Sequence, residues 1–194
     1  MHSQNDEEAF VLAAVRLREP GRVLDIGAWD GLTFSNTAAL LASGWGGVLV
    51  EPAPGPFAKL LDRYGAREDI VLVNAAVTPE RRIAEFWEAS GDAVSTLEME
   101  HRRKWSDKVP FRRMFLQTLP LSELLGRWPG PYEVVSIDAE GTSWAIWAAM
   151  PFEELGTRAV VVEHDGRVVE VTTRGKNLGF RVADVNAENV VLVR

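Results

Sequence analysis

Short apolar runs alternate with amphipathic segments along most of this chain. Five apolar runs have the length of β-strands, and they occupy residues 22–26, 46–51, 70–73, 133–138 and 158–163. Segments between them have the period of a helix that buries one face; in 57–65, apolar side chains recur at spacings of three, four and seven residues. Regular alternation of strands and helices with short connections predicts right-handed crossovers and an α/β fold around a parallel sheet.

The pattern extends to both ends of the chain. We expect an N-terminal helix within residues 1–20, because its apolar side chains share one helical face before a Pro-Gly pair ends the segment. We expect two strands at the other end, at about 180–184 and 189–193, and a further short strand at 83–89. The 194 residues contain no Pro/Gly/Ser-rich linker, so we predict one domain, residues 1–194.

Residues 90–118 break the alternation. This stretch is polar and without sustained period, and loops of that length in compact domains are usually lids or binding loops, so we predict a lid or substrate loop. Its cations, which include Arg102, Arg103 and Lys104, form a local basic patch on an acidic protein. Such a patch could recruit an anionic acceptor, or it could be a solvated loop.

Composition excludes several classes of protein. The formal net charge of −7 disfavours a polyanion, so we expect no nucleic-acid partner. The chain has no cysteine, which removes disulfides and thiolate nucleophiles, and no apolar run approaches the ~18 residues of a membrane span. The first ten residues are polar and acidic, unlike a signal peptide, so we expect a cytoplasmic protein.

The most informative motif follows the first predicted strand. Asp25, Gly27 and Gly31 describe a strand, a tight turn and the start of a helix, which is typical of chains that bind a nucleoside-containing cofactor. The spacing D-x-G-x-x-x-G differs from the G-x-G-x-x-G of dinucleotide sites, which makes a nicotinamide-dependent oxidoreductase the less favoured alternative. An acid at this turn repels a pyrophosphate and attracts the ammonium and sulfonium of S-adenosylmethionine. Glu51, which ends the second strand, is placed to accept hydrogen bonds from both ribose hydroxyls.

Three residues near predicted strand ends are candidates for a catalytic base: Asp138, Glu140 and His164. The carboxyl ends of parallel strands share one edge of a sheet, so these side chains should face the cofactor. The two acids could instead cap the following helix, and His164 could be a structural histidine. All three could also bind a divalent metal, but no ligand spacing demands one, and we predict none.

A series of motifs resembles the FkbM-type S-adenosylmethionine-dependent methyltransferases. The motifs follow the family's order over most of the chain: DIGAWDG at 25–31, VEPAP at 50–54, VNAAV at 73–77, VSTL at 94–97, TLPLSELL at 118–125, SIDAEG at 136–141 and VVVEH at 160–164. The resemblance implies a three-layer, Rossmann-like class I methyltransferase fold with seven mostly parallel strands, the last one antiparallel. It also implies methyl transfer to a hydroxyl oxygen of a small-molecule or glycan-like acceptor.

The same resemblance implies roles for individual residues. Those implied to contact the methionine end of the cofactor are Asp25, Gly27, Ala28 and Gly31, and those implied to lie at the adenine are Asn74 and Ala75. Asp138 would face the transferred methyl group. Two positions depart from the family's pattern: Trp29 stands where Asn is common, and Ser143 where an acid is common. Loss of that acid leaves open a catalytically weak module that binds the cofactor.

Overall fold

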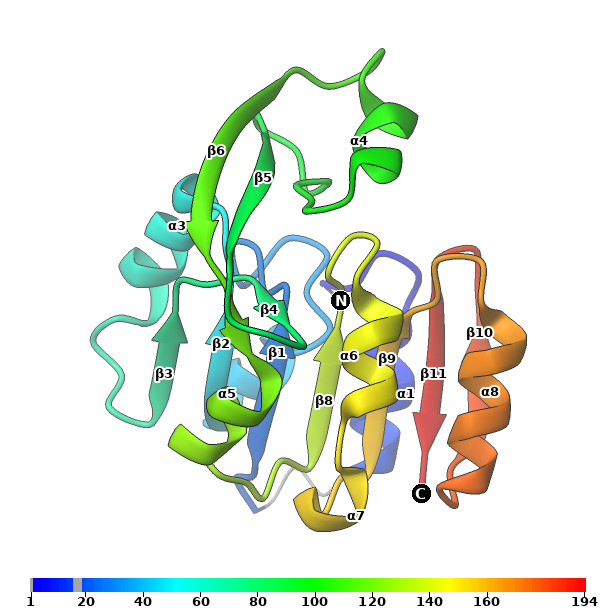
Figure 1. The fold of residues 1–194 in the computed structure, drawn as a ribbon. Helices are drawn as coiled ribbons and strands as arrows, with labels where there is room; N and C mark the ends of the chain where they lie inside the picture. Colours follow the sequence, from blue (N-terminus) through cyan, green and yellow to red (C-terminus); the bar gives the residue numbers. More distant parts are fainter. Residues whose placement is uncertain (1, 16–18) are drawn as a thin grey trace.

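A seven-stranded sheet forms the centre of the computed structural model, which describes residues 2–15 and 19–194. The strand order is β10-β11-β9-β8-β1-β2-β3. In Figure 1 the sheet extends from β3 on the left to β10 on the right. The strands are β1 (Arg22–Ile26), β2 (Gly46–Val50), β3 (Ile70–Val73), β8 (Val134–Ile137), β9 (Ala159–Glu163), β10 (Arg181–Val185) and β11 (Asn189–Val193). Strands β3, β2, β1, β8 and β9 pair in parallel, while β11 is antiparallel to β9 and β10. The predicted α/β sheet is therefore confirmed, including its antiparallel last strand.

Helices cover both faces of the sheet and make it the middle of three layers (Figure 1). One face packs against α1 (Glu7–Ala14), α2 (Ala38–Ala42) and α3 (Pro54–Tyr64), and the other against α5 (Leu121–Arg127), α6 (Ser143–Ala149), α7 (Phe152–Leu155) and α8 (Val168–Asn177). Alternation along each strand separates the two cores: in β1, Leu24 and Ile26 face α5–α8 and Val23 faces α1–α3. No helix in the described ranges has the length and apolar character that crossing a membrane requires.

A hairpin stands above the carboxyl edge of the sheet (Figure 1). It consists of β5 (Ile83–Ala89) and β6 (Phe111–Gln117), which pair antiparallel, with α4 (Met99–Trp105) between them. We call residues 83–117 the arm. Two short strands at its base, β4 (Val77–Thr78) and β7 (Leu119–Pro120), pair in parallel. The strand expected at 83–89 is confirmed, but 90–118 is not a structureless loop, because it contains α4 and β6. Adjacent arginines in β6, Arg112 and Arg113, interrupt the period of two that would have predicted a strand.

Two predicted helices are shorter than expected. The N-terminal helix covers 7–14, and of the predicted 1–20, residues 1 and 16–18 lie outside the described part. The helix after the first glycine turn begins only at Ala38, whereas its pattern starts at Leu32. The Asp30 carboxylate accepts hydrogen bonds from the backbone N–H groups of Leu32 (3.0 Å) and Thr33 (2.8 Å). Such local side-chain bonds compete with helix formation, so the chain forms a longer loop here.

Candidate cofactor and active site

A cavity lies at the carboxyl ends of β1, β2 and β8, beneath the arm. Its lining residues belong to the segments 25–36, 50–52, 75–77, 86–97 and 136–142. The strand order reverses at this point, because β1 lies between β2 on one side and β8 on the other. Ligands of open α/β sheets bind in the crevice at such a switch point. The fold therefore puts the cavity where a cofactor is expected.

The first turn is built around a glycine that tolerates no side chain. Gly27 has a φ of +88°, and a Cβ added to it would lie 1.6 Å from the backbone oxygen of Asp138. The backbone N–H groups of Gly27 and Ala28 donate to the carbonyl of Val50, at 2.9 and 3.0 Å. The turn is thus pressed between the ends of β2 and β8, and both residues line the cavity.

Asp25 lines the cavity and also anchors the loop after β1. Its side chain is buried, at 3% exposure, and accepts a 2.6 Å hydrogen bond from the Thr37 hydroxyl. Burial raises the pKa of Asp25 to about 6, although hydrogen bonds from Thr37 and Ser136 oppose this rise. A buried carboxyl without a cationic partner favours a cationic ligand, because such a ligand stabilises its charged form.

Glu51 holds the second turn of the cavity wall. Its carboxylate, 5% exposed, accepts hydrogen bonds from the backbone N–H groups of Trp29 (3.0 Å) and Ala53 (2.7 Å). Burial raises its pKa to about 7 against the effect of these bonds. Each carboxylate oxygen has a second lone pair, so two further donors, such as vicinal hydroxyls, can still be bound.

Two of the predicted cofactor residues do not line the cavity. Asn74 donates from its side chain to the carbonyls of Glu51 (2.7 Å) and Pro52 (3.1 Å), so it fixes the chain after β2. Gly31 faces α3 instead: a Cβ there would meet the side chains of Tyr64 and Leu60. Ala75, by contrast, does line the cavity. Five of the predicted cofactor residues thus line one cavity: Asp25, Gly27, Ala28, Glu51 and Ala75. Asn74 and Gly31 lie outside its lining.

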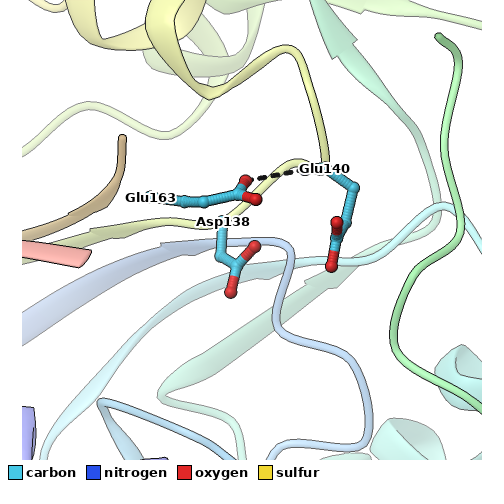
Figure 2. A group of neighbouring side chains, drawn as sticks. All are labelled: Asp138, Glu140 and Glu163. Carbon is cyan, nitrogen blue, oxygen red and sulfur yellow. Dashed lines mark hydrogen bonds between the residues drawn. The ribbon is translucent and has the colours of Figure 1, made fainter. Parts of the chain in front are cut away.

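Three carboxyl groups converge beside the end of β8. Figure 2 shows the side chains of Asp138, Glu140 and Glu163 close together. Each offers a carboxylate oxygen, and these oxygens lie within 4.8 Å of one another. We call these residues the acid cluster. Glu163 accepts hydrogen bonds from the Glu140 backbone N–H (3.1 Å) and the Ser143 hydroxyl (2.7 Å). Asp138 and Glu140 line the cavity. Glu163 lies outside the lining and binds the backbone of Glu140. Within the described residues this geometry could also hold a divalent cation.

The acid cluster has unusual protonation chemistry. Burial raises the pKa of Asp138 and Glu163 well above the usual range, and charge repulsion within the cluster adds to the rise. The pKa of Glu140 rises to about 7, mainly through burial, although its contact with His101 lowers it. A carboxyl group with a pKa near neutrality can exchange a proton during a reaction, as a general base must. The sequence did not single out Glu163, but it ends an apolar run with an acid, as Glu51 and Asp138 do.

The arm contacts the acid cluster directly. His101 Nε2 of α4 lies 2.7 Å from a carboxylate oxygen of Glu140, and the Thr96 hydroxyl donates to the Glu140 carbonyl at 2.6 Å. Gly141 has a φ of +95°, and the side chains of Glu98 and His101 pack against its backbone. A Cβ at this position would lie 3.2 Å from Glu98 Cγ and 3.6 Å from His101 Cβ. These contacts join the arm to the loop after β8. Arm residues between 86 and 97 form part of the cavity wall.

Four further candidate residues, besides Asn74 and Gly31, lie outside the cavity lining. His164 uses both ring nitrogens locally: Nδ1 accepts from the backbone N–H of Gly166 (3.0 Å), and Nε2 lies 3.3 Å from the carbonyl of Asn186. It is therefore placed as a structural histidine. The other three are the cations Arg102, Arg103 and Lys104. The Arg102 guanidinium lies 4.0 Å over the Trp87 ring, and the remaining two are exposed on α4. The basic patch is thus on the outer part of the arm and not in the cavity.

Comparison with known proteins adds a structural likeness. No family model matches the sequence, and no curated protein matches it. Among solved structures, the chain is similar to the FkbM methyltransferase of Methylobacillus flagellatus KT, with a TM-score of 0.51 and 11% identity over 99% of this chain and 48% of that one. It is also similar to an NADB-Rossmann superfamily protein of Streptococcus agalactiae, with a TM-score of 0.50 and 13% identity over 99% and 69%. The chain therefore has a Rossmann-like α/β fold that an FkbM methyltransferase shares.

Proposed function

We propose that this protein is an S-adenosylmethionine-dependent methyltransferase. The observation that carries the proposal is the chemistry of the cavity: four buried or half-buried carboxyl groups line it, and no Lys or Arg of the described chain does. A dinucleotide pyrophosphate would meet only like charge there. A cofactor with a sulfonium and an ammonium group would meet opposite charge. The sequence resemblance to the FkbM family and the fold shared with an FkbM methyltransferase support the same function.

In the proposed binding mode, each turn of the cavity holds one part of the cofactor. The turn at Asp25, Gly27 and Ala28 holds the methionine portion, with Asp25 near its ammonium group. Glu51 accepts hydrogen bonds from the ribose hydroxyls through its free lone pairs. Ala75 borders the adenine. The methyl group then faces Asp138 at the end of β8.

The reaction we propose is an in-line displacement at the methyl carbon. The protein aligns the acceptor atom, the methyl group and the sulfur, and a carboxylate of the acid cluster takes the acceptor's proton. The family resemblance implies a hydroxyl oxygen as the acceptor atom, on a small or glycan-like molecule. The arm excludes water from the site while His101 contacts Glu140.

A binding module without turnover is the second candidate, favoured by Ser143 in place of the acid common in the FkbM family. Ser143, however, donates to Glu163 at 2.7 Å and accepts from the Ala139 backbone N–H at 2.8 Å. A carboxyl group is thus present beside Asp138 and Glu140 even though position 143 is not acidic. This arrangement favours the enzyme over the module.

Calorimetric titration with S-adenosylhomocysteine and with NAD tests the proposal. We expect S-adenosylhomocysteine to bind and NAD not to. Glu51→Gln should weaken S-adenosylhomocysteine binding about tenfold, the loss of roughly 1.4 kcal/mol for a charge-assisted bond to ribose. Glu153→Gln, which makes the same charge change at an exposed residue of α7, serves as the control. Binding of NAD alone would refute the proposal, and release of S-adenosylhomocysteine with an acceptor panel separates enzyme from module.

A further inference from the structure

We infer that the methyl acceptor is an amine that enters the site as an ammonium ion. This inference rests on the proposed function and names the substrate class of the same site. It departs from the hydroxyl acceptor that the sequence resemblance implies and from the anionic acceptor that the basic patch indicated.

The first support is the charge of the cavity. Its ionisable lining consists of Asp25, Glu51, Asp138 and Glu140, with no lysine, arginine or histidine from the described ranges. A cofactor bound as proposed would occupy the first two of these carboxylates. Asp138 and Glu140 would remain in front of the methyl group, with Glu163 within 4.8 Å of them. An anionic acceptor would meet these carboxyl groups with no cationic side chain among the described lining residues to offset them, whereas an ammonium ion supplies the opposite charge.

The second support is a hydrogen-bond acceptor that lacks a donor. Asn36 lines the cavity at 7% exposure, and its side-chain oxygen has no partner among the described residues. Its Nδ2 donates to the Ser136 hydroxyl at 3.3 Å. Ser136 lies on β8 and Asp138 directly follows that strand, and both side chains line the same cavity. An orphaned buried oxygen is costly unless a ligand supplies a donor, and an ammonium group carries up to three N–H donors.

The third support is the position of the cations on the arm. Arg102 packs on Trp87, and Lys104 lies 5.3 Å over Trp105, so both are engaged with aromatic rings. Arg103 is exposed on α4. The residue that the arm presents to the acid cluster is His101, and its Nε2 lies against Glu140. No Lys or Arg of the arm lines the cavity, so the Asp138 carboxyl has no cationic partner among the described residues there, and a cationic acceptor would stabilise its charged form.

The chemistry of the acid cluster suits an amine. The ammonium group gives a proton to a carboxylate of Asp138 or Glu140, and the freed nitrogen lone pair attacks the methyl carbon. The N–C bond forms as the C–S bond breaks, which yields a methylated ammonium ion and neutral S-adenosylhomocysteine. The proton donors differ in acidity: an alkylammonium ion has a pKa of about 10.4, and a hydroxyl group has a water-like pKa of about 15.7. A carboxylate base therefore removes a proton from the ammonium ion more easily.

Three probes that differ in charge test this inference: benzylamine, benzyl alcohol and benzoate. Each is titrated into the protein saturated with S-adenosylhomocysteine at pH 7.5 and low salt. We expect benzylamine to bind at least tenfold more tightly than the other two. Asp138→Asn and Glu140→Gln should each remove most of this preference, while Glu153→Gln should retain it. Affinity for S-adenosylhomocysteine, measured first for every variant, reports whether its cavity is intact.

The outcomes separate the inference from the proposed function. Failure of the wild-type protein to bind S-adenosylhomocysteine would count against the proposed function. If S-adenosylhomocysteine binds but the alcohol or benzoate equals the amine, or none of the probes binds, the amine inference is overturned. Mass spectrometry of products from matched amine and alcohol acceptors gives a second readout: methyl on nitrogen supports the inference, and methyl on oxygen refutes it.

Discussion

Replacing Glu51 by Gln should flatten the pH dependence of the protein's stability. Glu51 is 5% exposed, and burial raises its pKa from an ordinary 4.5 to about 7. The folded protein therefore keeps this proton up to about pH 7, while the unfolded chain loses it near pH 4.5. Between these values the folded state binds more protons, so the free energy of unfolding falls as the pH rises. At 1.36 kcal/mol per pKa unit, the fall due to Glu51 is about 3 kcal/mol.

Urea unfolding of the ligand-free protein at pH 5 and pH 8 measures this fall. In Glu51→Gln the difference between the two pH values should shrink by about 3 kcal/mol, because the amide does not ionise. The variant should also lose about 1–3 kcal/mol at pH 5, since Gln offers one oxygen to the N–H groups of Trp29 and Ala53. Glu153→Gln, exposed on α7, should leave the difference unchanged. An equal fall in wild type and Glu51→Gln would refute the assignment of the proton to Glu51.

Two further substitutions test the geometry of the cavity. Gly27→Ala should destabilise the fold by ~3 kcal/mol more than Gly44→Ala, as measured by urea unfolding, because both glycines have positive φ but only the Cβ at position 27 would strike the backbone of Asp138. Equal losses would show that the turn can move away. His101→Ala should make cleavage within 90–110 several-fold faster in limited proteolysis without S-adenosylhomocysteine, since it removes the contact with Glu140. Unchanged cleavage would mean that other contacts hold the arm.

The parts of the fold that were predicted from sequence depend on local patterns. Every strand of the central sheet except the edge strand β10 coincides with an apolar run, because a strand buried on both faces reads as continuous apolar sequence. Helices fared less well where side chains bond locally, as the Asp30 carboxylate does before α2. The parallel pairing of β3, β2, β1, β8 and β9 followed from the regular alternation of strands and helices with short connections. The antiparallel position of β11 came from the family resemblance and not from periodicity.

The candidate site was predicted in part because strand ends meet at one edge. Asp25, Glu51 and Asp138 each belong to a strand end, and the parallel sheet brings them to one cavity. The contact between His101 and Glu140 could not be predicted in this way, because it joins the arm to a loop 39 residues further along and depends on how α4 docks. For the same reason, charge alone could not tell which side of the arm carries the cations.

Trp29 contributes to the cofactor turn through its backbone and to the cavity wall through its side chain. Its φ of 46° is a conformation that Asn adopts more readily than Trp. The bond that matters for the turn is made by its backbone N–H, which donates to Glu51, and any residue except proline could supply it. The indole ring stacks against Phe34 at 6.3 Å between centroids, and Lys59 lies 5.4 Å over it. These contacts offset the backbone strain and form an aromatic part of the cavity wall, so the Trp29 side chain determines the shape of the site while its backbone determines the bonding of the turn.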